Sequence, residues 1–175
     1  MYLYDIKYSR WIRKQITMSD NKRERGMIWV FTLNNYTDEE LKHFKEVGNG
    51  WHVVFGFETA PTTGTPHLQG CVWREDEEGD LVSVERRSVR RVVGMRAWVD
   101  KSDSLCGAVG YCLKGLDFWI SWVSKEECLR MVEVIKVAKV FGQENTWLGS
   151  VFFNAVECPE YTPFEAAHSL HMAKI

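Results

Sequence analysis

Two short segments of this chain carry side chains whose types and spacing could support phosphodiester chemistry. His67 and Gln69 are two residues apart, so on a β-strand both side chains would point to the same face. An imidazole nitrogen and an amide oxygen side by side can hold a divalent metal ion. Tyr111 and Lys114 are three residues apart, so on a helix a phenol and an ammonium would share a face. A metal site plus a tyrosine beside a cation is what tyrosine-dependent cleavage of a phosphodiester bond requires.

Glu58 is the third metal ligand that the sequence suggests. It ends an apolar segment at 51–58, and a turn at 60–65 would lay this segment beside the one that carries His67. A carboxylate, an amide oxygen and an imidazole suit Mg²⁺ or Mn²⁺ better than Zn²⁺, which prefers sulfur and nitrogen ligands. Taken singly, these residues have plainer interpretations: a histidine held by a local hydrogen bond, a tyrosine packed in the core, and a surface lysine.

The elements that must position these residues alternate in type along the chain. The expected strands are 27–33, 51–58, 65–73, 95–99 and 116–123, and the expected helices follow a capping box at Thr37 or span 83–93, 104–113 and 125–141. The order β-α-β-β-α-β-α-β predicts an α+β fold with antiparallel strands. The helix at 125–141 has an apolar stripe that must cover either the main domain or another copy of the chain. No element is assigned beyond Gly142.

Composition bounds the class of protein. The chain has 175 residues, of which 45% are hydrophobic and 13% aromatic, so it can bury a sizeable core. Its net charge of −2 does not indicate a nucleic-acid binder, but basic residues cluster at 10–25 and at 86–96. For the second cluster, a phosphate-binding surface and a solvated helix face remain equal alternatives. Five cysteines without a Cys-x-x-Cys pair argue against a disulfide framework and a zinc knuckle, and fit a reducing compartment.

The sequence also suggests where the protein resides and how it is divided. The charged N-terminus lacks the apolar segment of a secretory signal, and no apolar run approaches the length of a membrane span. We therefore expect a soluble intracellular protein without a membrane partner. Residues 1–26 are interpreted as an N-terminal extension, 27–124 as the folded domain, and 125–175 as an accessory helix and tail. The helix at 125–141 offers a surface for self-association.

Three motifs occur together and in order. They are WVFTLNN at 29–35, GTPHLQG at 64–70 and YCLKG at 111–115. Together they resemble the motifs of replication-initiator (Rep) proteins of circular single-stranded DNA viruses of the circovirus and nanovirus kind. The catalytic domain of those proteins belongs to the HUH endonuclease family, and the similarity spans roughly residues 27–123. Gln69 stands where the HUH name implies a second histidine, as in the circovirus-like branch.

The resemblance implies a fold, a reaction and roles for individual residues. The implied fold is a five-stranded antiparallel sheet with flanking helices, similar to an RNA-recognition module. The implied activity is that of a metal-dependent tyrosine endonuclease and nucleotidyltransferase, which nicks and joins single-stranded DNA at an origin hairpin to start rolling-circle replication. The implied roles are metal binding, with Mg²⁺ or Mn²⁺, for Glu58, His67 and Gln69, nucleophile for Tyr111, positioning for Lys114, and origin binding for Phe31, Thr32, Asn34 and Asn35.

The implied reaction passes through a covalent protein–DNA linkage, a 5′-phosphotyrosine. A free tyrosine has a pKa near 10, so a neighbouring cation and a metal ion would favour the reactive phenolate. A viral protein of this kind would act in the host nucleus. Full-length relatives carry a superfamily-3 helicase domain, whereas this sequence has no G-x-x-x-x-G-K-[ST] phosphate loop, so we expect no unwinding activity.

Two alternative functions remain open. One is a nucleic-acid-binding module of the same fold in which the chemistry is lost or unused. The other is a plasmid replication or mobilisation nickase with the same site. The complete set of ligands and the tyrosine favour an enzyme over the binding module, because drift would be expected to spoil at least one of them.

Overall fold

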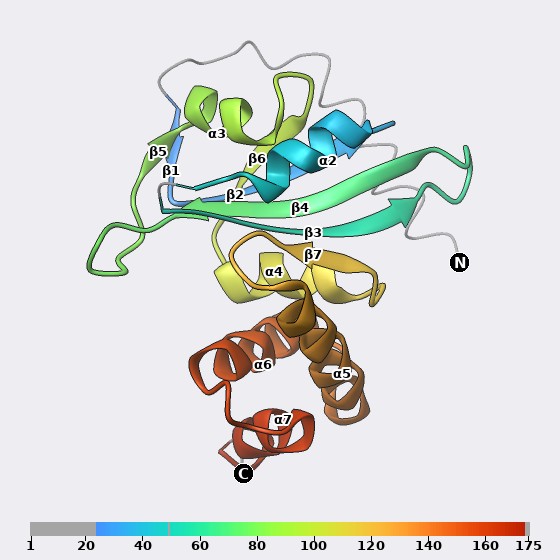
Figure 1. Cartoon of the computed structure of the whole chain (residues 1–175), viewed down its shortest axis with the longest axis vertical. Helices are drawn as coiled ribbons and strands as arrows, with labels where there is room; N and C mark the ends of the chain where they lie inside the picture. The colour runs from blue at the N-terminus through green and yellow to red at the C-terminus, as the bar shows by residue number, and fades with distance from the viewer. Residues whose placement is uncertain (1–23, 49, 174–175) are drawn as a thin grey trace.

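The centre of the molecule is a five-stranded antiparallel sheet with the strand order β6-β2-β4-β3-β7 (Figure 1). The computed structural model describes residues 24–48 and 50–173. The strands are β2 (Ile28–Asn34), β3 (Trp51–Thr59), β4 (Pro66–Arg74), β6 (Trp98–Ser102) and β7 (Phe118–Ile120). The α+β class and the antiparallel sheet of five strands are therefore confirmed. The long central strand β4 carries the His-x-Gln pair.

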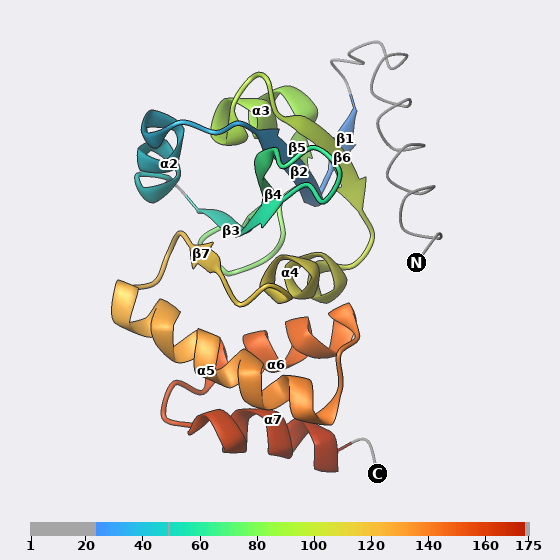
Figure 2. The ribbon, with the colours of Figure 1, turned by 90° about the vertical axis from the view of Figure 1, so that its right-hand side faces the viewer.

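Helices lie on both faces of this sheet (Figure 2). The helices above one face are α2 (Asp38–Lys45) and α3 (Arg86–Val93), and those on the other side are α4 (Leu105–Leu113), α5 (Lys125–Phe141), α6 (Asn145–Glu157) and α7 (Pro163–Met172). A short ribbon of β1 (Arg25–Gly26) and β5 (Val84–Glu85) leads into α3. No helix in the described ranges is long and apolar enough to cross a membrane.

Successive side chains along each strand point to opposite faces of the sheet, so a separate hydrophobic cluster forms on each face. On β4, Leu68 and Val72 pack toward α2 and α3, while Cys71 and Trp73 pack into the cluster that includes α4, α5 and α6. Because strand side chains alternate, His67 and Gln69 point to the same face as Cys71, the α4 side. The sequence-based expectation that the two residues share a face is therefore confirmed.

Glycine residues let α4 lie unusually close to both of its neighbours. A Cβ atom at Gly110 would collide with the backbone of Asn145 in α6, and one at Gly149 would collide with the backbone of Cys106 in α4. On the other side, a Cβ atom at Gly56 of β3 would lie 2.5 Å from the carbonyl oxygen of Cys112. Helix α4 is therefore held between the sheet and α6, with backbone against backbone on both sides.

The C-terminal region holds more regular structure than the sequence indicated. The helix expected at 125–141 is present with those bounds, but two further helices follow it where no element was assigned. Phe153 of α6 lies edge-to-face with Trp73 of β4, with ring centroids 6.0 Å apart. Apolar side chains of residues 125–172 complete the core on the α4 face, so the apolar stripe of the 125–141 helix covers the main domain, one of the two surfaces expected for it. Of the expected extension at 1–26, residues 1–23 lie outside the described residues.

Two expected strands are shifted or shortened. The strand expected at 95–99 lies at Trp98–Ser102, because a turn in which the Ala97 amide donates to the Gly94 carbonyl follows α3. The strand expected at 116–123 is reduced to Phe118–Ile120. Leu116 has a φ of +62°, a left-handed conformation that interrupts extended backbone before the strand. Both shifts lie at edge strands.

Candidate metal and tyrosine site

The strand register brings the three expected metal ligands to one end of the sheet. β3 and β4 pair with Glu58 opposite His67 and Gly56 opposite Gln69. Since paired residues on neighbouring strands project to the same side, Glu58 joins His67 and Gln69 on the α4 face. The hairpin expected from the turn at 60–65 is confirmed, with the Ala60 amide donating to the Thr65 carbonyl over 2.9 Å.

His67 is held by two contacts, one at each ring nitrogen. Its Nε2 lies 3.3 Å from Glu58 Oε2, and its Nδ1 lies 3.3 Å from the carbonyl oxygen of Thr65. The side chain is only 3% exposed. Hydrogen bonding to the Glu58 carboxylate raises the pKa of His67, and burial opposes this rise. In the neutral tautomer with Nδ1–H donating to Thr65, Nε2 presents its lone pair toward Glu58, which is the orientation a metal ligand needs.

The side chain of Gln69 is oriented by Thr32, which the sequence-based interpretation assigned to DNA binding. The Thr32 hydroxyl on β2 donates to Gln69 Oε1 over 2.9 Å, and the two residues are paired across the β2–β4 ladder. The hydrogen bond fixes the amide oxygen of Gln69 next to Thr32, and the second lone pair of that oxygen can still serve a cation. In the described ranges, no group of three or more His, Cys, Asp and Glu residues could hold a metal ion. The expected set has two such residues and an amide, a donor set that fits a hard divalent cation.

Helix α4 presents Tyr111 and Lys114 on one surface. The Lys114 Nζ atom lies 5.4 Å from the centroid of the Tyr111 ring, so the expectation that they share a helix face is confirmed. Tyr111 is 40% exposed and thus accessible to a macromolecular substrate. From α5, Lys139 Nζ donates to the Lys114 carbonyl over 2.8 Å and so caps the end of α4.

Cys112 lies buried at the end of α4 that packs against β3. Burial raises the pKa of its thiol well above the ordinary value, and the charges of Cys71 and Glu58 add to that rise. A buried thiol with a raised pKa is not a nucleophile, so the expectation that Cys112 is a core residue is confirmed. The close approach of Gly56 to the Cys112 carbonyl oxygen places the residue after Tyr111 against β3, two positions before Glu58.

The first motif divides into buried and exposed residues. Phe31 is completely buried under α2, where its ring stacks on Phe44 with centroids 5.6 Å apart. Thr32 is also buried, so neither side chain offers an exposed surface, and the part of both residues in origin binding stays a prediction. Phe31 shapes the core, and Thr32 orients Gln69. Asn34 and Asn35 are exposed at the same end of the sheet as His67, and their binding to DNA stays a prediction.

Arg96 fixes the exposed asparagines, and sequence reasoning did not identify it as part of the site. Its guanidinium donates to the carbonyl oxygens of Asn34 and Asn35 and, through Nε and Nη2, to both carboxylate oxygens of Glu40, at 2.8 and 2.7 Å. This bidentate pair lowers the pKa of Glu40. Asn35 has a φ of +48°, and the contacts of Arg96 hold the backbone there in this rare conformation. In the sequence, Arg96 lies just beyond the basic helix expected at 83–93, and this position was the signal that could have identified it.

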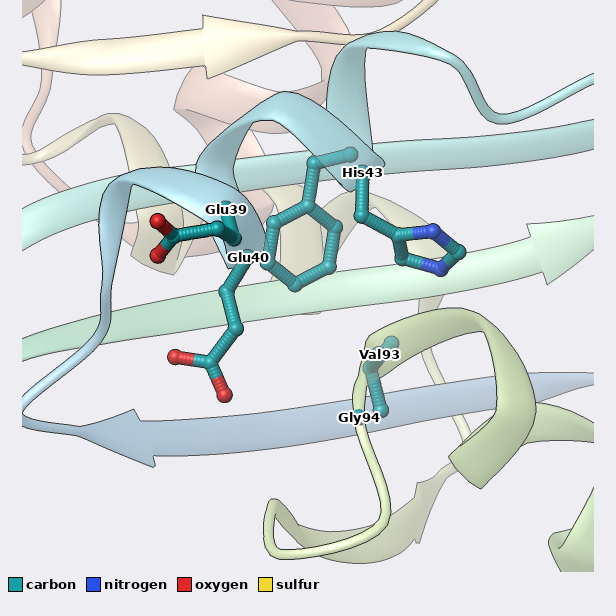
Figure 3. Close-up of a pocket in the computed structure, with 6 residues that line it drawn as sticks. Glu39, Glu40, His43, Val93 and Gly94 are labelled. Carbon is teal, nitrogen blue, oxygen red and sulfur yellow. The ribbon is translucent and has the colours of Figure 1, made fainter.

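A shallow pocket lies next to this clamp, between α2 and the end of α3. Figure 3 shows Glu39, Glu40 and His43 on α2 across from Val93 and Gly94. Its floor includes Phe44, which belongs to the core on the α2 side of the sheet. The pocket is therefore on the opposite face of the sheet from His67 and Gln69 and takes no part in the metal and tyrosine site.

A scan against protein-family models and a search of curated proteins found no match to this chain. The functional interpretation accordingly depends on the motifs, on the strand register around His67 and on the side-chain contacts of Gln69, Tyr111 and Arg96.

Proposed function

We propose that this chain is an HUH-type endonuclease that nicks and rejoins single-stranded DNA at a replication origin through a 5′-phosphotyrosine intermediate. The observation that carries the proposal is the pairing of Glu58 with His67 on the α4 face. Gln69 lies two residues after His67 on the same strand and faces the same side. The exposed Tyr111 with Lys114 beside its ring supplies the second half of the site. The position of the His-x-Gln pair on a central strand of a five-stranded antiparallel sheet supports the finer fold assignment, similar to an RNA-recognition module.

Each residue has a distinct task in the proposed reaction. A divalent ion, Mg²⁺ or Mn²⁺, held by Glu58, His67 and Gln69 would act as a Lewis acid on a non-bridging phosphate oxygen. Tyr111 loses its proton and its oxygen attacks the phosphorus in line, so that a tyrosine O–P bond forms while the P–O3′ bond breaks. The leaving group departs as a 3′-hydroxyl, which can prime synthesis. Lys114 holds the phenol and the phosphate in position.

The reverse reaction follows from the same residues. The phosphotyrosine bond retains the energy of the broken phosphodiester, so a later 3′-hydroxyl can attack it, release Tyr111 and join the DNA without a nucleotide cofactor. The substrate strand has to be single or extruded, since a duplex hides the scissile geometry. Asn34 and Asn35, held by Arg96 beside the site, are the proposed contacts to that strand. As a viral initiator, the protein would act in the host nucleus.

Covalent capture tests the proposal. The substrate is a pool of hairpin oligonucleotides with randomised single-stranded loops and a fluorescent label at the 3′ end. The fragment that stays on a 5′-phosphotyrosine retains this label, so a labelled protein band on a denaturing gel reports the adduct. We expect the band with Mn²⁺ and the native chain, and its loss with Tyr111→Phe. Binding of the pool without any adduct would favour the alternative of a binding module.

A further inference from the structure

The arginines of α3 divide into two kinds. Arg86 is buried, where its Nε donates to Glu24 Oε2 over 2.8 Å and its Nη1 donates to the Val99 carbonyl over 2.7 Å. Arg87 and Arg91 are exposed, and neither side chain makes a hydrogen bond or an ion pair with another residue in the described part of the chain. Within residues 24–48 and 50–173, these two side chains therefore contribute no polar contact to the fold.

These two arginines form one face that points away from the core. They are four residues apart and therefore lie one above the other on the helix, while Val89 and Val93 are buried on the opposite side. Like charges at this spacing repel each other, and α3 contains no acidic residue to offset the repulsion. In a face exposed only to water, this repulsion between the two arginines is not offset by any partner. An anionic ligand would be attracted by both guanidinium groups and would offset the repulsion.

The arginine face, defined as Arg87 and Arg91, leads toward the candidate site. Helix α3 ends at Val93, and Arg96 follows in the next turn, where it holds the carbonyl oxygens of Asn34 and Asn35. Asn34 is paired with His67 across β2 and β4. A polyanion that lies along α3 is therefore directed to the end of the sheet that carries the proposed metal ligands.

The composition of the face indicates the kind of nucleic acid. Surfaces that hold single strands combine basic residues with aromatic side chains on which bases stack. Helix α3 has the sequence RRSVRRVV and offers no aromatic ring. A basic surface without stacking rings suits contacts to phosphates, which dominate sequence-independent binding to duplex DNA. The acidic Glu40, which faces the end of α3 across the pocket of Figure 3, is neutralised by Arg96.

We propose that the arginine face of α3 binds the phosphate backbone of the duplex stem that flanks the nick site. This inference rests on the proposed function, because it assigns the stem of the origin hairpin to α3 and the single-stranded segment to Asn34, Asn35 and Tyr111. The nick site then lies at the junction between a duplex held by charge and a single strand held at the sheet end.

The test compares two double variants with equal charge changes. Arg87→Gln/Arg91→Gln removes the arginine face, and Lys125→Gln/Lys136→Gln removes two exposed cations from α5, on the opposite side of the sheet. Fluorescence anisotropy measures the affinity of each full-length chain for a blunt DNA duplex and for a single strand of the same length, over a series of salt concentrations. Circular dichroism and thermal melting establish that both variants are folded.

We expect the arginine variant to lose about tenfold or more in affinity for the duplex and less than about threefold for the single strand. The slope of log K against log salt for the duplex should become shallower by about 1.8, because two phosphates would no longer be neutralised by the protein. The lysine variant should change neither affinity by more than about twofold. Equal losses for the two variants, equal losses for the two DNAs, or no loss at all would each overturn the proposal.

The test of the duplex-binding surface and the test of the proposed nicking reaction have separate outcomes. If duplex binding depends on Arg87 and Arg91 but no covalent adduct forms, the duplex-binding surface is supported and the nicking reaction is rejected. If an adduct forms through Tyr111 but the two arginine substitutions leave duplex affinity unchanged, only the duplex-binding surface is rejected.

Discussion

Thr32 on β2 donates a 2.9 Å hydrogen bond to the amide oxygen of Gln69 on β4, directly across the strand pair. The motif expected to contact DNA thereby holds one of the proposed metal ligands from the neighbouring strand. In metal sites, a hydrogen bond to a ligand fixes the orientation of that ligand and its readiness to bind.

Replacing Thr32 with valine removes the hydroxyl and retains the shape of the side chain. We expect the affinity for Mn²⁺ to fall about tenfold or more, because Gln69 would then sample orientations that turn its oxygen away. Isothermal titration with MnCl₂ measures the change, and Thr63→Val, at an exposed threonine of the β3–β4 turn, is the matched control. Unchanged Mn²⁺ affinity in Thr32→Val would show that Gln69 needs no support or is not a ligand.

Two substitutions on α4 separate the nucleophile from its cation. Tyr111→Phe should abolish the covalent adduct and leave DNA binding within a few-fold, since it removes one oxygen and little packing. Lys114→Met should slow adduct formation by roughly 100-fold, the size of effect seen when a group that stabilises charge in the transition state is removed. Single-turnover adduct formation with excess protein gives both rates, and an adduct on the Phe variant would assign the nucleophile elsewhere.

The Glu58–His67 pair predicts a pH dependence for the metal-free protein. The carboxylate raises the pKa of His67, so Glu58→Gln should lower that pKa. For the sign, a raised pKa in the folded state means that the pair stabilises the protein below the unfolded pKa of histidine, near 6.5, and that this contribution is lost as pH rises through the folded value. A proton on His67 also competes with a metal ion, so Mn²⁺ affinity should weaken as pH falls.

NMR titration of the histidine ring protons measures this effect directly. His43 on the exposed face of α2 provides an internal reference in the same spectra. A His67 pKa that is the same in the native chain and in Glu58→Gln would show that the 3.3 Å contact carries no charge interaction in solution.

The helices after residue 124 should be required for a stable fold and for the proposed nicking activity. A chain that ends at residue 124 loses α5, α6 and α7 and exposes the apolar surface of α4 and of Trp73, so we expect it to aggregate or to lose nicking. Gly149→Ala tests the same packing more finely. Its Cβ would collide with the backbone of Cys106, which should destabilise the fold by about 1–3 kcal/mol.

Gly48→Ala is the control for that substitution, because a Cβ atom there meets nothing within 4 Å. Urea denaturation of the two alanine variants measures the difference in the free energy of unfolding. Full stability and full nicking activity in the chain that ends at residue 124 would show that the C-terminal helices are accessory.

The sequence by itself determined those features that depend on residues close together along the chain. Alternation places His67 and Gln69 on one face of a strand, and helical periodicity places Tyr111 beside Lys114. The capping box at Thr37 sets the start of α2, with Thr37 and Glu40 satisfying each other's backbone amides. A similar box at Thr162 marks the start of α7 and could have revealed that helix.

The tertiary structure alone decided which distant residues meet. The β3–β4 register sets Glu58 against His67, and the β2–β4 register gives Thr32 its role toward Gln69. The burial of Phe31 and the close packing of α4 on α6 depend on partners far away in the chain. Such contacts arise from strand pairing and from complementary surfaces, which local propensity and spacing do not encode, because a one-residue change of register would turn every side chain of a strand to the opposite face.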